Sequence, residues 1–148
     1  MIMVYAGTNI MAEYALSRIS AELGYDYHVF SAEQGSRLEE SLEELILKGS
    51  DIYIIDISTF SDSEESLVSC VDRLCRAVNC DIIIYAPDTV PSARVLTSFK
   101  AIGYDKIISE TMNQTLLHEQ FKECIMRPPV STAPEDVQED LIMQRDDI

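Results

Sequence analysis

The sequence predicts an α/β fold, a three-layer sandwich in which helices cover both faces of a parallel sheet. Continuously apolar segments such as 52–55 and 82–84 alternate with amphipathic segments five times between residues 1 and 126. A strand with one wet face alternates polar and apolar residues, so unbroken apolar strands belong to a sheet that is covered on both sides. Strict alternation of strand and helix is typical of parallel sheets built from right-handed crossovers.

A turn separates the first strand from the first helix. The strand is the apolar run 1–6, and Gly7 permits a sharp turn after it, where Thr8 or Asn9 can cap a helix. In the helix, expected over 11–23, apolar residues recur at three- and four-residue intervals.

The second strand is predicted at the edge of the sheet. Polar and apolar residues alternate over 25–30, which suits a strand with one partly exposed side. Ser36 and Glu39 then form a capping-box pattern, and a second amphipathic helix is expected after it.

The third strand is the most apolar and is predicted at the centre of the sheet. Asp56 ends its buried run and so lies at the carboxyl end of the strand, where open α/β sheets place their ligand sites. Ser61 and Glu64 form another capping-box pattern before a third helix, whose apolar stripe reaches Val78.

Two further strand and helix pairs complete the predicted body. The fourth strand spans 81–85, and Pro91 suits the first turn of the helix after it. A short fifth strand follows over 106–108, and Thr111 with Gln114 predicts the cap of the last helix.

Composition limits the function classes. The formal charge of −15, from 26 acidic and 11 basic residues, disfavours nucleic acid and anionic membrane surfaces as partners. No segment approaches the ~18 apolar residues of a membrane span, and the four cysteines lack zinc-site spacing, so we expect a cytoplasmic protein with reduced thiols. Residues 1–126 are predicted to form one domain, and 127–148 an acidic, proline-containing tail or linker.

The body resembles the receiver domain of bacterial response regulators, the superfamily of the chemotaxis response regulators. Asp56 ends the third strand, and 101–105, Ala-Ile-Gly-Tyr-Asp, is similar to the Ala-x-Gly-Ala-Asp approach to the fifth strand of receivers. The resemblance implies a flavodoxin-like sheet of order 2-1-3-4-5 with five helices.

The resemblance also implies which residues phosphoryl transfer would need. Receivers phosphorylate the third-strand aspartate using Mg²⁺, two acids after the first strand, a Thr or Ser ending the fourth strand and a Lys ending the fifth. Of these groups this sequence keeps only the aspartate. The other positions carry residues of different chemistry: Gly7, Thr8 and Asn9, then Tyr85 or Ala86, then Ser109 or Glu110. One carboxylate is a poor Mg²⁺ site, and Glu110 would repel a phosphoryl group.

We therefore expect a pocket at the carboxyl ends of the strands that carries no catalytic residue, metal or cofactor. The polar and small residues predicted to line it are Gly7, Thr8, Asn9, Asp56, Ser58, Ala86, Asp88, Ser109 and Glu110. Asp56 is the candidate phosphoacceptor, and the simpler expectation is that its carboxylate bonds nearby backbone amides.

These departures favour a pseudo-receiver that is not an enzyme and acts as a regulatory interaction or assembly module in bacterial signalling. The expected partner is a protein, and one option is a second copy bound through the fourth helix, fifth strand and fifth helix. The cations of that face would be Arg94, Lys100, Lys106 and Lys122. The alternatives are a phosphoacceptor receiver using Asp56 and a flavodoxin-like binder of a small ligand.

Overall fold

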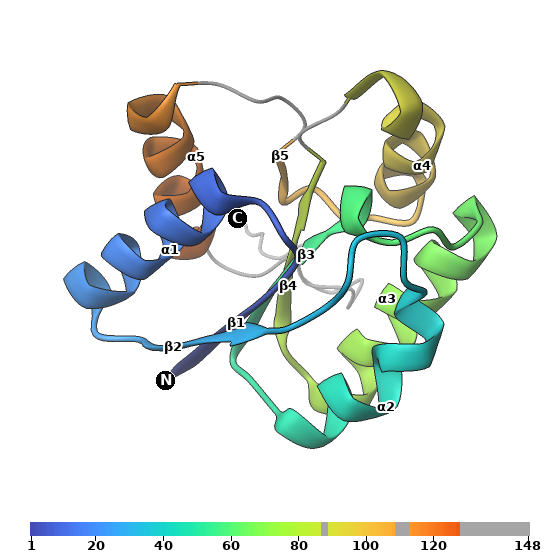
Figure 1. The fold of residues 1–148 in the computed structure, drawn as a ribbon, viewed down its shortest axis with the longest axis horizontal. Helices are drawn as coiled ribbons and strands as arrows, with labels where there is room; N and C mark the ends of the chain where they lie inside the picture. Colours follow the sequence, from blue (N-terminus) through green and yellow to red (C-terminus); the bar gives the residue numbers. More distant parts are fainter. Residues whose placement is uncertain (87–88, 109–112, 128–148) are drawn as a thin grey trace, which may run out of the picture.

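The computed structural model describes residues 1–86, 89–108 and 113–127, and Figure 1 shows their arrangement. Five parallel strands form one sheet of order β2-β1-β3-β4-β5, as predicted. They are β1 (Ile2–Ala6), β2 (Asp26–Phe30), β3 (Ile52–Asp56), β4 (Asp81–Tyr85) and β5 (Ile107–Ile108). The helices are α1 (Ile10–Leu23), α2 (Leu38–Lys48), α3 (Glu64–Val78), α4 (Thr89–Ala101) and α5 (Gln114–Met126), with a short 3₁₀ helix, η1 (Ile57–Thr59). The predicted tail lies outside the described residues, apart from Arg127.

Helices cover both faces of the sheet, which confirms the three-layer prediction. Figure 1 shows α1 and α5 on one side and α2, α3 and α4 on the other. Every residue of β3 is buried, as the unbroken apolar run requires. Successive side chains of a strand point to opposite faces, so Tyr53 and Ile55 belong to the α2–α3–α4 core and Ile54 to the α1–α5 core.

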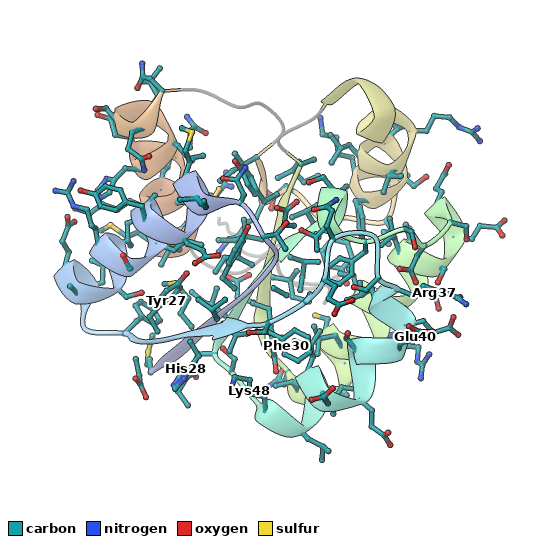
Figure 2. All side chains as sticks on the ribbon, in the orientation of Figure 1. Tyr27, His28, Phe30, Arg37, Glu40 and Lys48 are labelled. Carbon is teal, nitrogen blue, oxygen red and sulfur yellow. The ribbon has the colours of Figure 1, made fainter. Side chains whose placement is uncertain are left out.

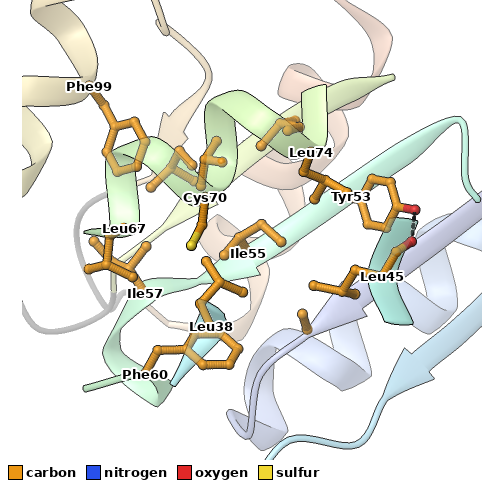
Figure 3. Packing of buried hydrophobic residues seen from close by; sticks show 14 of the residues in the cluster. Leu38, Leu45, Tyr53, Ile55, Ile57, Phe60, Leu67, Cys70, Leu74 and Phe99 are labelled. Atoms are coloured by element: carbon orange, nitrogen blue, oxygen red, sulfur yellow. Dashed lines mark hydrogen bonds between the residues drawn. The ribbon is translucent and has the colours of Figure 1, made fainter. Parts of the chain in front are cut away.

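The α2–α3–α4 side holds the larger apolar cluster. Figure 3 shows Leu38 of α2 and Cys70 of α3 beside Ile55. In the same view the Tyr53 hydroxyl donates a hydrogen bond to the backbone oxygen of Leu45 at 2.5 Å. Fully burying one such aliphatic side chain contributes about 1.5–3 kcal/mol, so this cluster is a main source of the stability of the sandwich.

Two of the predicted helix caps are wrong. Arg37, not Ser36, precedes α2, and its side chain makes no cap bond. Asp62 of the β3–α3 loop caps this helix instead, because its carboxylate accepts from the backbone nitrogens of Leu38 and Glu39 at 2.5 and 3.2 Å. Ser63 rather than Ser61 caps α3. A capping box is a pattern of residues close together in the sequence, so it cannot reveal a capping carboxylate that comes from a distant loop.

The remaining cap predictions have mixed outcomes. Asn9 caps α1, as expected, by accepting from the backbone nitrogen of Ala12 at 2.9 Å. The cap of α5 is Asn113, and the predicted Thr111 lies outside the described residues. No helix in the described part of the chain is both long and apolar enough to cross a bilayer.

Candidate functional site

Asp56 occupies the carboxyl end of the central strand and is almost completely buried, with 1% of its surface exposed. One carboxylate oxygen accepts from the backbone nitrogen of Ser58 at 3.0 Å and from its hydroxyl at 2.6 Å. The other accepts from the Tyr5 hydroxyl of β1 at 3.1 Å. The carboxylate therefore caps η1 and ties β3 to β1, and both of its oxygens have partners.

Neutral groups surround this carboxylate. Burial raises the pKa of Asp56, and hydrogen bonds from Ser58 and Tyr5 offset part of that effect. Burial, followed by the nearby Asp56 charge, raises the pKa of Tyr5 far above its ordinary value and that of Tyr85 to about 12. Among the described residues no ion pair involves Asp56, so no cation balances its charge there.

Gly7 follows β1 and packs directly against Asp56 and Tyr5. A Cβ at this position would lie 2.5 Å from the Cβ of Asp56 and 2.6 Å from the Tyr5 hydroxyl oxygen. That hydroxyl also accepts from the backbone nitrogen of Asn9 at 2.9 Å. The Tyr5 side chain thus occupies the space that a longer side chain at position 7 would need.

A second cluster of polar side chains lies beside Asp56, and its members, Thr8, Gln34 and Thr59, come from three loops. The Thr8 hydroxyl donates to Gln34 Oε1 at 2.8 Å, and Gln34 Nε2 donates to the backbone oxygen of Ser58 at 2.8 Å. Thr59, fully buried, accepts from the backbone nitrogen of Thr8 at 3.2 Å. Gln34, in the β2–α2 loop, thereby bridges the loops that follow β1 and β3.

At the end of β4, Tyr85 and Ala86 make no hydrogen bond to Asp56 or to its polar neighbours among the described residues. Tyr85 points into the α1–α5 core and packs against Phe121 with ring centroids 5.2 Å apart. Its buried hydroxyl has no hydrogen-bond partner among residues 1–86, 89–108 and 113–127. Ala86 is buried, and its backbone nitrogen donates to the oxygen of Ile108 at 2.8 Å.

The structure thus brings together part of the predicted pocket. Gly7, Thr8, Asp56 and Ser58 form one cluster, and Asn9 joins it through its backbone nitrogen. Asp88, Ser109 and Glu110 lie outside the described residues. Sequence reasoning missed Tyr5, Thr59 and Gln34, because a tyrosine in an apolar strand indicates core, and the other two belong to no motif.

The described donor set does not fit Mg²⁺. This ion prefers octahedral oxygen ligands and is usually held by carboxylates that keep several waters on it. Here one buried carboxylate already accepts three hydrogen bonds, and Gly7 supplies no side chain. Within the described ranges, no three His, Cys, Asp or Glu side chains converge on one point.

The four predicted interface cations lie in different environments. Lys106 is buried, with 3% exposed; it pairs with Asp81 and donates to the backbone oxygen of Arg127 at 2.7 Å. Lys106, at the amino edge of the sheet, therefore offers no free cation to a partner at the predicted face, because Asp81 and the Arg127 carbonyl already hold its ammonium. Lys122 reaches Glu22 of α1 at 3.0 Å. Arg94, on α4, lies 3.5 Å from Glu64 of α3, and Lys100 is exposed on α4.

Comparison with solved structures identifies the fold. A putative CpaE2 pilus assembly protein from Sinorhizobium meliloti aligns with a TM-score of 0.57 and 9% identity, over 84% of this chain and 99% of that one. A response regulator from Thermotoga maritima aligns at 0.56 and 17% identity, over 84% and 96%. The chemotaxis response regulator CheY4 of Vibrio cholerae aligns at 0.55 and 14%, over 83% and 97%.

At such identities the likeness concerns the fold alone, and that fold is the response-regulator receiver fold predicted from the sequence. No protein-family model matches the chain, and a search of curated proteins finds no match.

Proposed function

We propose that this chain, which has the fold of the response-regulator receivers, is a non-catalytic pseudo-receiver. Its role would be that of a regulatory interaction or assembly module in bacterial signalling, located in the cytoplasm. The observation that carries the proposal is the state of Asp56: the carboxylate is 1% exposed and both its oxygens accept hydrogen bonds from the protein.

Phosphoryl transfer to Asp56 would require groups that these surroundings do not supply. The transfer depends on positioning and on cations that neutralise the phosphoryl oxygens. At the Asp56 end of the sheet the described neighbours are hydroxyls, an amide and a glycine. The buried lysine, Lys106, pairs with Asp81 at the opposite edge. At the positions after β5 the sequence carries Ser109 and Glu110, neither of which is a cation.

An interaction role is consistent with the composition and with the structural neighbours. The chain retains a complete receiver sheet, and several of the structures similar to it are response regulators. Another is a putative pilus assembly protein, which supports assembly as one role for this fold. The charge of −15 directs the proposal towards proteins and away from nucleic acid.

Phosphorylation chemistry tests the proposal directly. The purified chain and its Asp56→Asn variant are incubated with acetyl phosphate and Mg²⁺, and intact masses are measured. We expect neither protein to gain a phosphoryl group. A phosphoryl mass on the wild type that is absent from Asp56→Asn would establish the phosphoacceptor alternative. Flavin absorbance in the purified protein, or thermal stabilisation by added nucleotide, would instead support the small-ligand alternative.

A further inference from the structure

A groove lies between α3 and α4 on the face of the sheet opposite α1 and α5, and Glu64 of α3 joins the two helices through Ser98 and Arg94 of α4. The groove has a volume of about 1050 Å³ and is lined by both helices, the start of β4 and the loop that joins α4 to β5. Figure 1 places α3 and α4 side by side on this face. A groove of this size, lined along two helices, has room for an extended or helical peptide segment.

The inner surface of the groove is partly apolar. Val68 of α3 and Tyr104 of the α4–β5 loop pack against the core and also line the groove. Tyr104 is held in place by edge-to-face contact with Phe99, at 5.7 Å between ring centroids. Ile102 is 51% exposed and adds an accessible apolar side chain to the same lining. These side chains offer burial area to an apolar residue of a partner.

The charge of the groove is negative. Its lining carries five acids against two cations: Glu64, Glu65, Asp72, Asp81 and Asp105 face Arg76 and Lys106. Asp81 pairs with Lys106, and Asp72 lies 3.1 Å from Arg76. Glu64 is paired with Arg94 of α4 at 3.5 Å.

Two of these acids, Glu65 and Asp105, form no ion pair with a described residue, and both are exposed. Glu65 lies in the first turn of α3, towards the carboxyl edge of the sheet, and Asp105 lies in the loop before β5, at the amino edge. They therefore mark the two ends of the groove.

We propose that the α3–α4 groove binds a cationic amphipathic segment of a partner protein, with an apolar residue against Val68, Ile102 and Tyr104 and basic residues near Glu65 and Asp105. The proposal rests on the proposed function and specifies the surface and the partner chemistry. Helix-in-groove recognition of this kind uses apolar anchors for affinity, and flanking charges set orientation and association rate.

Other occupants fit less well because they carry the wrong charge. Residues 128–148 of this chain have six acids and one arginine, so like charges would oppose the tail in the groove. A second copy is opposed in the same way, since each copy carries −15. Nucleic acid and anionic lipid are disfavoured for the same reason.

Binding of designed peptides to the full chain tests the proposal. The probe is a labelled helical peptide of leucine and lysine with the leucines on one face, and its counterpart replaces every lysine by glutamate. Anisotropy is measured at physiological ionic strength, where weak surface attraction is largely screened. We expect saturable binding of the lysine peptide and none of the glutamate peptide.

Matched charge reversals locate the binding. The groove variant is Glu65→Lys with Asp105→Lys; the control is Glu40→Lys with Glu119→Lys, which makes the same charge change. Glu40 lies in the first turn of α2, as Glu65 does in that of α3, so both variants lose an acid at a helix start; Figure 2 shows Glu40 on α2. We expect the dissociation constant to rise roughly tenfold or more for the groove variant and about twofold or less for the control.

Three outcomes would overturn the proposal: no binding by the wild type, equal weakening by both variants, or unchanged binding by the groove variant. Ile102→Ser adds a check on the apolar contact, because it should also weaken binding without changing charge. Circular dichroism verifies that each variant is folded. The two proposals fail separately. Phosphorylation of Asp56 would refute the pseudo-receiver proposal, whereas only the peptide measurements can refute the groove proposal.

Discussion

Two carboxylates, one buried and one partly buried, lie at opposite edges of the same sheet, and they have different kinds of partner. Asp56, at the carboxyl end of β3, accepts from Tyr5 and Ser58 and has no cation among its described neighbours. Asp81, at the amino end of β4, pairs with the buried Lys106. A receiver needs its lysine at the first of these edges, and this chain buries a lysine at the second.

Each of the two carboxylates joins elements of the sheet, and neither is placed for phosphorylation chemistry. The Lys106 ammonium joins β4, the approach to β5 and the end of α5, because it also donates to the backbone oxygen of Arg127. Asp56 joins β1, β3 and η1 through hydroxyl and amide donors. Both carboxylates thus have a structural explanation, and neither arrangement resembles a site for a transferred phosphoryl group.

Removing the cation at the amino edge should give the largest effect. Lys106→Met leaves the Asp81 carboxylate, 14% exposed, and the Arg127 carbonyl without their donor. Removing one partner of a fully buried pair costs about 3–5 kcal/mol. Because the Asp81 carboxylate is partly exposed, we expect a loss of about 3 kcal/mol in the free energy of unfolding, measured by urea denaturation.

Two further variants show whether the lost pairing is the cause. Lys100→Met changes an exposed lysine on α4 and should alter the free energy of unfolding by less than about 0.5 kcal/mol. Lys106→Met combined with Asp81→Asn should recover part of the loss, since no unpaired charge remains. A single Lys106→Met variant as stable as the wild type would refute the structural role of the pair.

At the carboxyl edge, filling the space of Gly7 should give an intermediate effect. The φ angle of Gly7 is not positive, so its backbone accepts alanine, and in open space the substitution would stabilise the chain by about 0.4–1 kcal/mol. The added Cβ would instead lie 2.5 Å from Asp56 Cβ. We expect Gly7→Ala to destabilise by roughly 1–3 kcal/mol in thermal or urea unfolding. A stabilised variant would show that this edge has room for a side chain.

The sequence was sufficient for the fold because the fold rests on repeated patterns. The apolar run 52–55 identified a strand covered on both sides, and five alternations predicted the parallel sheet that the structure has. Burial on both faces leaves little choice of layer, because only the middle layer of a sandwich covers both sides of a strand. Strand order came from the resemblance to receivers, not from periodicity.

The contacts of the site could be predicted only in part, because they join residues far apart in the chain. Asp56 and Ser58 are local, and the bond between them follows from the preference of aspartate for nearby backbone nitrogens. The Tyr5 bond spans 51 positions, and no local pattern marks that hydroxyl as polar machinery. The burial of Lys106 could not be predicted for the same reason. A lysine is usually solvated, and only the fold brings Asp81 to it.

Asp56→Asn should give the smallest and most diagnostic effect. Because burial raises the pKa of Asp56, the folded chain holds its proton more tightly than the unfolded chain, whose value is near 3.8. Between these two pKa values the folded state binds more protons, so the contribution of Asp56 to stability falls as pH rises, and it is constant above the folded pKa. In the variant, asparagine Oδ1 can still accept from Ser58, Nδ2 can donate to the Tyr5 hydroxyl oxygen, and the side chain carries no charge. We expect the variant to be more stable than the wild type at neutral pH, by on the order of 1 kcal/mol, with this advantage disappearing near pH 4 and below.

The matched control is Asp105→Asn, which removes an exposed charge of the same sign and so measures the general benefit of reducing net acidity. Stabilities are compared across pH at physiological ionic strength. Equal curves for the two variants would mean that the surroundings of Asp56 impose no cost on its ionised form. An advantage confined to Asp56→Asn would instead show that this edge disfavours one negative charge. A phosphoryl group would bring additional negative charge to the same place, with no cation among the described neighbours to balance it.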